Sequence, residues 1–347
     1  MVARGLVVHT ALLALAAGLA FHSWTADPNQ APKHGETELW AGRPDQVHEV
    51  RYESRLGDLT LQPHEDSNGR YYVGFAKKKS PPDAAKKPDP SSAQSIDGKD
   101  REPPKPPEEK TARFIATKDG EELVAQLAPL RALRVLGKIS DAQKADFGFD
   151  KEEGTLTIRT GDSLHKLIFG GTTPGGSDYY AKDADTGNAY VVSGSIVRDL
   201  TNADQRLVEH KLHAWEDTAP KRVKITAGGA SRELVRSEAK KDAWTKPGAT
   251  GDKDETATNW LTKVDRLRTT SYEGDVLHPP PAPADYVLKV EYFDERKSIG
   301  YLELIHRPAE DGKTDYVART EQTRWYASVI RSQAEQIEQD LKSVVAQ

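Results

Sequence analysis

Alternating hydrophobic and polar residues predict a chain built mainly of short strands. Val47–Tyr52 alternates with a period of two, and Leu59–Leu61 and Arg70–Phe75 follow after turn residues. This period places every second side chain on one buried face, so the three segments predict an antiparallel meander. Similar short strands are predicted further along, at residues 112–117, 155–159, 164–169, 178–181 and 189–192.

Apolar residues at helical spacing predict four helices between these strands. Leu123, Leu127, Leu130 and Leu133 recur on one face of a helix that begins near Asp119, and Pro129 is expected to kink or divide it. The strands come in groups, without the β-α-β alternation of parallel sheets. The pattern therefore predicts an α+β fold in which helices pack on one face of each antiparallel sheet. The other three helices are predicted at about residues 195–208, 255–268 and 325–345.

The order of elements occurs twice, which predicts two related domains. Strands at 222–226, 233–236 and 244–247 precede the helix at 255–268, and strands at 286–293, 299–305 and 315–318 precede the last helix. An internal duplication with a period of about 170 residues explains this order. We expect a first copy at 41–214, a second at 215–347, and a boundary near Trp215–Arg222.

A glycine-rich segment partly resembles a phosphate-binding loop, which raises the question of whether the chain binds a nucleotide. Gly171–Ser177 has the glycine spacing of a phosphate-binding loop, but Ser177 stands where the loop needs a lysine, and a strand follows in place of a helix. The corresponding segment of the second copy, Leu302–Arg319, keeps the strand, turn and strand without the glycine pairs. The sequence therefore favours a hairpin turn and predicts no bound nucleotide.

The first residues predict export from the cytoplasm. Arg4 precedes an almost charge-free run from Gly5 to Phe21, which is at the lower length limit for a membrane span and also resembles a signal peptide. Cleavage and retention both remain open for residues 1–25, and residues 26–40 form a polar tether. With Arg4 on the cytoplasmic side, we expect a single pass through the bacterial inner membrane and a periplasmic body.

Residues 77–110 interrupt the first copy with a different composition. They include eight prolines among lysines and acids, and Ile96 is their only large aliphatic residue. Such a segment buries too little apolar surface to pack, so it predicts a solvated, flexible loop inserted into the domain.

The amino-acid composition excludes every feature that requires cysteine and gives no support for nucleic-acid binding. Among 347 residues there is no cysteine, which excludes disulfides, thiol nucleophiles and a lipid-modified cysteine. The formal net charge of −5 gives no support for nucleic-acid binding.

Few residues suggest a site. His210 and His213 could share a helical face with carboxylates and hold a metal, but a third histidine and the H-E-x-x-H spacing are missing, so a structural role is favoured. No serine stands in a G-x-S-x-G elbow, and His165, His278 and His306 have no recognisable catalytic partner. We predict no catalytic residue and no cofactor. Four tryptophans could form a glycan platform, although their spacing favours core packing: Trp215, Trp244, Trp260 and Trp325.

Several motifs resemble a known family. They are Trp244-x-x-Pro247 before a helix, the run Ala132–Asp150 before two strands, the strand end Phe169–Gly170, and Trp40–Val47. Together with the apolar N-terminus they resemble the bacterial envelope family catalogued as domain of unknown function 4340. Its members are typically membrane-anchored and encoded beside ABC-type transporters of the gliding-motility class.

The resemblance implies a non-enzymatic accessory or scaffold protein of an envelope ABC-type transport complex, with membrane or periplasmic protein partners. One alternative is a periplasmic module that binds a glycan or another small ligand through aromatic residues in a cleft between the copies. A hydrolase or metalloenzyme would require His210, His213 and a carboxylate to converge on one metal position.

Overall fold

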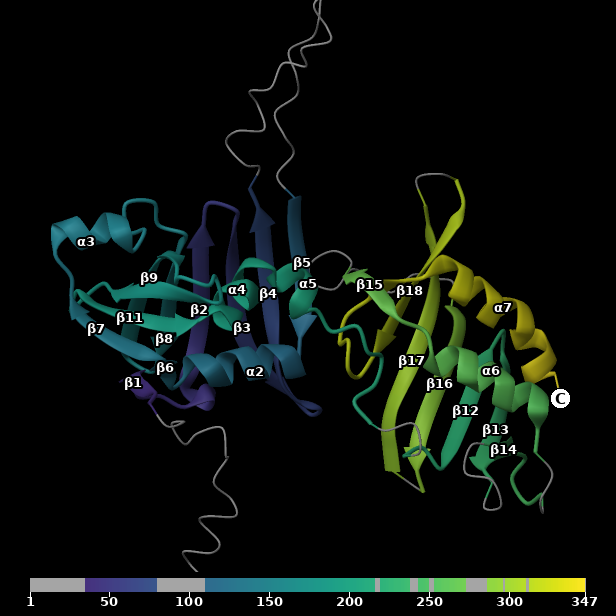
Figure 1. Ribbon diagram of the computed structural model, residues 1–347. Coiled ribbons are helices and arrows are strands. Elements are labelled where there is room, and N and C mark those ends of the chain that lie inside the picture. The colour runs from purple at the N-terminus through teal and green to yellow at the C-terminus, as the bar shows by residue number, and fades with distance from the viewer. Residues whose placement is uncertain are drawn as a thin grey trace, which may run out of the picture.

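The described residues form two large antiparallel sheets that lie side by side, each covered by helices, and one small two-stranded sheet (Figure 1). This computed structural model describes residues 35–79, 110–215, 219–237, 243–249, 253–272, 286–295, 297–309 and 312–346. The predicted anchor and the tether up to residue 34 lie outside these ranges, as do residues 80–109 of the proline-rich segment. Within the described ranges, no helix combines the length and apolar character needed to cross a membrane.

The N-terminal lobe, residues 35–79 and 110–208, contains a nine-stranded sheet. The predicted meander is confirmed, since its three strands pair in succession. The sheet order is β5-β4-β3-β2-β8-β9-β10-β11-β7, and a separate two-stranded sheet pairs β1 with β6. The strands are β1 (Thr37–Trp40), β2 (Val47–Ser54), β3 (Gly57–Asp66), β4 (Gly69–Lys78), β5 (Lys110–Ala116), β6 (Leu130–Ala132), β7 (Arg134–Lys138), β8 (Gly154–Thr160), β9 (Ser163–Thr172), β10 (Asp178–Asp183) and β11 (Asn188–Ser193).

The helices of this lobe are shorter than the leucine spacing predicts. The first helix ends at Leu127, two residues before Pro129, because proline cannot continue the hydrogen-bond ladder. Leu130 is therefore buried in a strand, and Leu133 is 39% exposed, so neither residue continues the predicted apolar face. The helical segments are η1 (Pro44–Gln46), α2 (Lys118–Leu127), α3 (Asp141–Asp146), α4 (Gly194–Thr201) and α5 (Ala203–Arg206).

The C-terminal lobe, the described part of residues 212–346, contains an eight-stranded sheet in the order β14-β13-β12-β16-β17-β18-β19-β15. Its strands are β12 (Arg222–Ala227), β13 (Ala230–Arg236), β14 (Trp244–Thr245), β15 (Thr269–Tyr272), β16 (Tyr286–Asp294), β17 (Lys297–Pro308), β18 (Thr314–Thr320) and β19 (Ala327–Val329). Its helices are α6 (Glu255–Asp265) and α7 (Arg331–Val345). The last helix begins later than predicted, because Ala327–Val329 pairs with β18 as a strand.

Corresponding strands are neighbours in both sheets. Each sheet places a meander of three strands beside a run of four, and ends on a short strand that precedes that run in the sequence. The order β4-β3-β2-β8-β9-β10-β11-β7 thus matches β14-β13-β12-β16-β17-β18-β19-β15, while β5 extends the first sheet alone.

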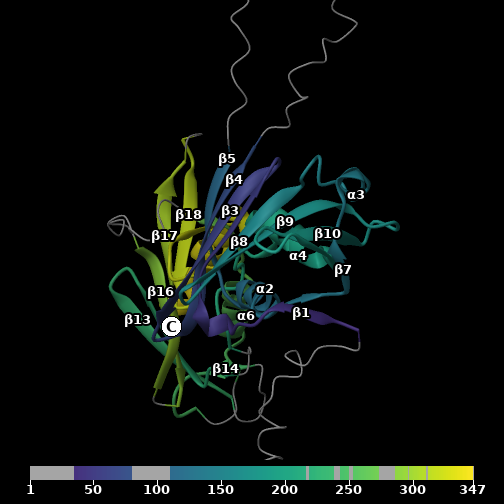
Figure 2. The same cartoon turned by 90° about the vertical axis from the view of Figure 1, so that its left-hand side faces the viewer.

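Each lobe has its own hydrophobic core between sheet and helices (Figures 1 and 2). In both lobes a buried indole donates a hydrogen bond to a helix carbonyl. Trp40 Nε1 donates to Leu127 O at 3.0 Å, and Trp260 Nε1 donates to Ile337 O at 2.8 Å. These bonds fix α2 and α7 against the remainder of their lobes.

The glycine-rich segment is a hairpin turn, as predicted. Strands β9 and β10 pair in antiparallel fashion on either side of it. The Thr173 N–H donates to Asp178 O and the Gly176 N–H donates to Thr173 O, both at 2.8 Å. Gly175 has φ of 105°, a backbone conformation that residues with a Cβ rarely adopt. The glycines therefore serve the turn.

Polar contacts connect the two lobes where β5 lies beside β15. The Glu209 N–H donates to Ile115 O of the first sheet at 2.8 Å, and Glu209 O accepts from the Tyr272 hydroxyl of the second sheet at 3.0 Å. Gln322 Nε2 donates to both Thr117 Oγ1 and Glu209 Oε2, at 3.0 and 2.9 Å. One residue, Glu209, is thus hydrogen-bonded to both lobes.

Arg324 makes a second contact between the lobes, two residues after Gln322. Arg324 Nε donates to Asp66 Oδ2 at 2.8 Å, and the guanidinium carbon is 4.3 Å from the centroid of the Tyr71 ring. The Arg324 side chain is only 9% exposed. Its charge is therefore held between the lobes by a carboxylate and an aromatic face.

Candidate functional site

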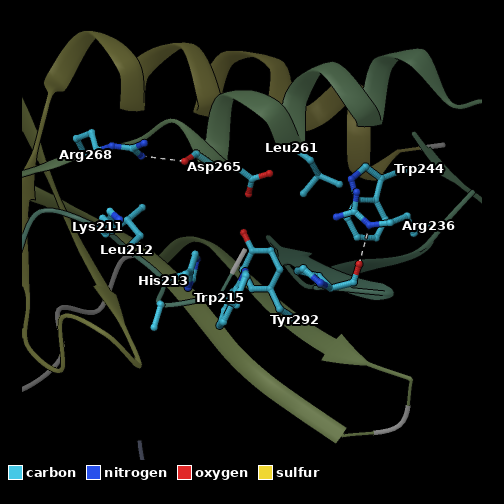
Figure 3. Close-up of a pocket in the computed structure, with 12 residues that line it drawn as sticks. Lys211, Leu212, His213, Trp215, Arg236, Trp244, Leu261, Asp265, Arg268 and Tyr292 are labelled. Carbon is cyan, nitrogen blue, oxygen red and sulfur yellow. Dashed lines mark hydrogen bonds between the residues drawn. The ribbon is translucent and has the colours of Figure 1, made fainter. Parts of the chain in front are cut away.

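A pocket within the C-terminal lobe lies between the end of α6, strand β16 and the segment that enters the lobe (Figure 3). It encloses about 550 Å³. Leu212 is 3% exposed and fixes the entering segment in the core, so that the residues after it face β16. The pocket wall includes Lys211, His213, Trp215, Arg236, Trp244, Leu261, Asp265, Arg268 and Tyr292.

His213 is held firmly at one edge of its ring. Its Nδ1 lies 2.8 Å from Glu321 Oε1, and the ring stacks on Trp215 with centroids 4.0 Å apart. Glu321 is fixed in turn, because its Oε2 accepts the Tyr301 N–H at 2.9 Å. The opposite nitrogen, His213 Nε2, is buried and has no hydrogen-bond partner among the described residues.

Tyr292 supplies a second buried polar group. The residue is 2% exposed, and its hydroxyl points toward the Asp265 carboxylate in Figure 3. This hydroxyl also lacks a hydrogen-bond partner in the described part of the chain. Burial, and secondly the negative charge of Asp265, raise the pKa of Tyr292 well above its ordinary value. The phenol is therefore neutral at physiological pH.

Gly300 makes room for the aromatic wall. A Cβ at this position would lie 2.2 Å from a ring carbon of Trp215 and 2.3 Å from Glu321 Oε2. Any side chain would displace the indole or the carboxylate that holds His213. Glycine is therefore required at position 300, because the Trp215 ring and the Glu321 carboxylate lie against its backbone.

Charged groups are distributed unevenly along the pocket. Figure 3 shows Lys211 and Arg268 at one end, and Trp244 with Arg236 at the other. The Arg236 guanidinium is 4.5 Å from the centroid of the Trp244 ring, and its Nε donates to Pro220 O at 2.7 Å. Arg268 Nη1 donates to the main-chain carbonyls of Asp265 and Leu267 at 3.0 and 2.9 Å.

The structure separates the two histidines proposed as metal ligands. The chain is not helical there, since α5 ends at Arg206, so His210 and His213 do not share a helical face. His210 Nδ1 is 3.0 Å from Thr269 O at the lobe junction, whereas His213 contacts Glu321. No group of three or more metal-ligating side chains occurs in the described ranges. The nearby Glu216 and Asp217 lie outside them.

The other candidates have different surroundings. Trp260 and Trp325 are buried in hydrophobic clusters, while Trp215 and Trp244 line the pocket. His165 stacks on Trp40, and His306 Nε2 lies 3.0 Å from Glu338 Oε2. His278 lies outside the described residues.

Sequence reasoning missed Tyr292, Asp265 and Glu321. Tyr292 belongs to an alternating strand and looks like a core residue, and Glu321 is 108 positions away from the histidine it holds. The pairing of β17 with β18 places Glu321 beside Tyr301, and His213 reaches the same carboxylate from the segment that enters the lobe. The sequence contains no local signal for such a contact.

Fold and pocket together define a two-lobed α+β protein with a polar, aromatic pocket of ligand size in its second lobe. The chain belongs to the family described as Domain of unknown function (DUF4340), whose model matches residues 92–290. The predicted family is thereby confirmed. No curated protein matches the chain significantly, and neither does any solved structure.

Proposed function

We propose that this protein is an exported, non-enzymatic accessory or scaffold protein of an envelope ABC-type transport complex. In this proposal the N-terminal segment anchors it in the bacterial inner membrane and both lobes lie in the periplasm. The family resemblance suggests the setting, and the junction between the lobes is the observation that carries the scaffold role.

The junction supports a scaffold because it limits relative motion of the lobes. Glu209 is hydrogen-bonded to both sheets, and Arg324 is held against Asp66 and Tyr71 of the other lobe. Lobes connected by few contacts would move as separate bodies. A body of fixed shape presents two sheets to protein partners without the entropic cost of ordering them first.

We also propose that the lobes are the two copies of an internal duplication, with a boundary at Glu209–Trp215. The matching strand order supports it, as does the change of hydrophobic core between Val208 and Leu212. The additional strand β5 and the proline-rich segment before it would then be later acquisitions of the first copy.

Co-purification tests the scaffold role. The full chain, tagged at its C-terminus, is isolated from detergent-solubilised membranes of its own bacterium and compared with a variant exported by a cleavable signal in place of residues 1–25. We expect transporter permease and ATPase subunits with the full chain and fewer with the variant. Recovery of the full chain without transporter subunits would contradict the proposal.

Intact-mass analysis of the same sample shows whether the N-terminus is Met1 or lies near Phe21.

A second candidate function, binding of a glycan or another small ligand, is favoured by the pocket. Trp215 and Trp244 line it, and two buried polar groups in its wall lack partners in the described ranges. The pocket lies inside the C-terminal lobe. Another hollow lies between the lobes beside β5 and β15, but its wall contains no tryptophan among the described residues.

A further inference from the structure

We propose that the pocket of the C-terminal lobe binds a saccharide ring that carries a carboxylate group. This inference rests on the second candidate function, small-ligand binding, and does not depend on the scaffold role. It follows from the positions of hydrogen-bonding groups, cations and aromatic rings along the pocket.

The centre of the pocket offers hydrogen bonds that the protein does not use. The Tyr292 hydroxyl faces the Asp265 carboxylate, which can only accept, so its oxygen remains as an acceptor for a ligand; His213 Nε2 is left over because Nδ1 faces Glu321. Buried polar groups in folded proteins are usually satisfied, and a polar ligand would satisfy the two such groups in this wall. A hydroxyl suits both groups, since it donates and accepts at once. Several hydroxyls on one ring are the defining feature of a saccharide.

One end of the pocket favours a negative charge. Lys211 and Arg268 lie there, and no described carboxylate forms an ion pair with either. The Arg268 guanidinium uses one nitrogen on main-chain carbonyls, which leaves donors in the planar geometry that carboxylates match. Asp265 is the one described acid in the wall, and it lies nearer to the Tyr292 hydroxyl in the centre.

The opposite end favours the apolar face of a ring. Trp244 and Leu261 are buried side chains of the wall there, with the Arg236 guanidinium over one face of Trp244, and Trp215 lies nearer the centre, stacked on His213. The volume of about 550 Å³ is within the range of small-molecule sites. A ligand of this kind would place its carboxylate at the cationic end, its hydroxyls in the centre and its C–H face at the apolar end of the pocket.

Three probes separate the contribution of the carboxylate from that of the hydroxyls. Glucuronate carries both features, glucose lacks the carboxylate, and cyclohexanecarboxylate lacks the hydroxyls. Calorimetry and tryptophan fluorescence with the purified full chain give each dissociation constant. We expect saturable binding of glucuronate, about threefold to fivefold tighter than that of glucose and also tighter than that of cyclohexanecarboxylate, because Lys211 and Arg268 are exposed and an exposed charge pair contributes modestly.

Matched variants assign the effect to residues. Arg268→Gln should reduce glucuronate affinity to that of glucose, whereas Arg266→Gln, at an exposed position outside the pocket on the same helix end, should leave it unchanged. Tyr292→Phe should weaken both sugars. Tyr286→Phe on the same strand, where the side chain is 45% exposed, is its control. Circular dichroism establishes that each variant is folded.

Each contrary result has its own meaning. Equal affinity for glucose and glucuronate, or equal losses in Arg268→Gln and Arg266→Gln, would overturn the acidic saccharide. Binding of cyclohexanecarboxylate alone would also overturn it but would keep a small-ligand site. Failure of all three probes to bind a folded chain would remove both the inference and the second candidate function, and the co-purification result would still decide the scaffold role.

Discussion

At the scale of single residues, position 300 tolerates only glycine, because its neighbours leave no room for a side chain. An added methyl group would overlap both the Trp215 ring and the Glu321 carboxylate. We therefore expect Gly300→Ala to lower the free energy of unfolding by about 1–3 kcal/mol, the usual cost of overpacking. Urea denaturation followed by tryptophan fluorescence measures the loss and also detects movement of the indole.

Gly171→Ala is the matched control for this substitution. Gly171 also lies in a strand, its φ is not positive, and a Cβ there would meet nothing closer than 3.6 Å. Its effect should stay within about 0.5 kcal/mol. If both variants lose the same stability, the close contact at Gly300 is not what the residue provides.

Buried tyrosines predict that the protein loses stability in alkali. Burial raises the pKa of Tyr326 to about 12 and that of Tyr292 well above its ordinary value. In the unfolded chain both phenols ionise near pH 10. Their contribution is therefore fully present below about pH 10 and is lost as the pH rises toward about 12, because only the unfolded state releases the protons.

Urea midpoints between about pH 9 and about pH 11.5 measure this loss, and absorbance at about 295 nm follows phenolate formation. Tyr326→Phe removes one of the groups, so its midpoint should fall less steeply with pH than that of the wild type. A midpoint that stays constant over this range would show that the phenols ionise equally in both states.

At the scale of elements, each lobe depends on one indole that is hydrogen-bonded to a helix. Trp260 is 1% exposed and donates to Ile337 O, so Trp260→Phe removes both volume and the hydrogen bond. We expect a loss of about 2 kcal/mol. Hydrogen exchange measured by mass spectrometry should show weaker protection in α6 and α7, with α2 unaffected.

Trp40→Phe is the mirror experiment, because Trp40 donates to Leu127 O of α2. It should weaken protection of α2 and leave α7 unchanged. Equal loss of protection in both lobes after either substitution would mean that the lobes unfold only as one unit.

Periodicity predicted the long elements well and the short ones poorly. The meander, the hairpin at Gly175 and helix α6 have repeating patterns over several residues, and all are present. Strands β7 and β15 contain five and four residues, too few for a period to be recognised. The helix predicted through Leu133 failed because the leucine spacing continues past Pro129, where the backbone cannot follow.

The pocket was beyond sequence reasoning for a different reason. Its two tryptophans were candidates, but nothing in the sequence distinguishes them from Trp260 and Trp325, which are buried in cores, and Trp244 is itself buried. What distinguishes the pocket is the unsatisfied hydroxyl of Tyr292 and the nitrogen of His213. Satisfaction of a polar atom is decided by contacts between distant strands, which one sequence does not reveal.

At the scale of the whole molecule, the relative orientation of the lobes depends on Arg324. Arg324→Gln removes the charge that Asp66 and the Tyr71 ring stabilise, at a cost of about 1–2 kcal/mol. Both lobes should remain folded while the distance between them varies more widely. Spin labels on exposed residues of α3 and α7 would report this as a broader distribution of distances.

Arg43→Gln is the control for Arg324→Gln. It breaks an ion pair of similar length, Arg43 to Asp45, whose side chains are 69% and 59% exposed and lie in one lobe. Exposed pairs contribute little, so the distribution of distances should match the wild type. An unchanged distribution in Arg324→Gln as well would mean that the hydrogen bonds of Glu209 alone fix the lobes.

The connection between β4 and β5 has a practical consequence for experiments in living cells. The two strands pair in register up to Lys78 and Lys110, so the chain leaves the sheet and returns to it at neighbouring positions. A segment inserted between Lys78 and Lys110 therefore needs to span only the distance between adjacent strands, about 4.8 Å. A fluorescent protein or an epitope tag placed between them would leave both chain termini native. A cell could then display the label on the intact protein, and the position of the protein could be followed by microscopy without altering either terminus.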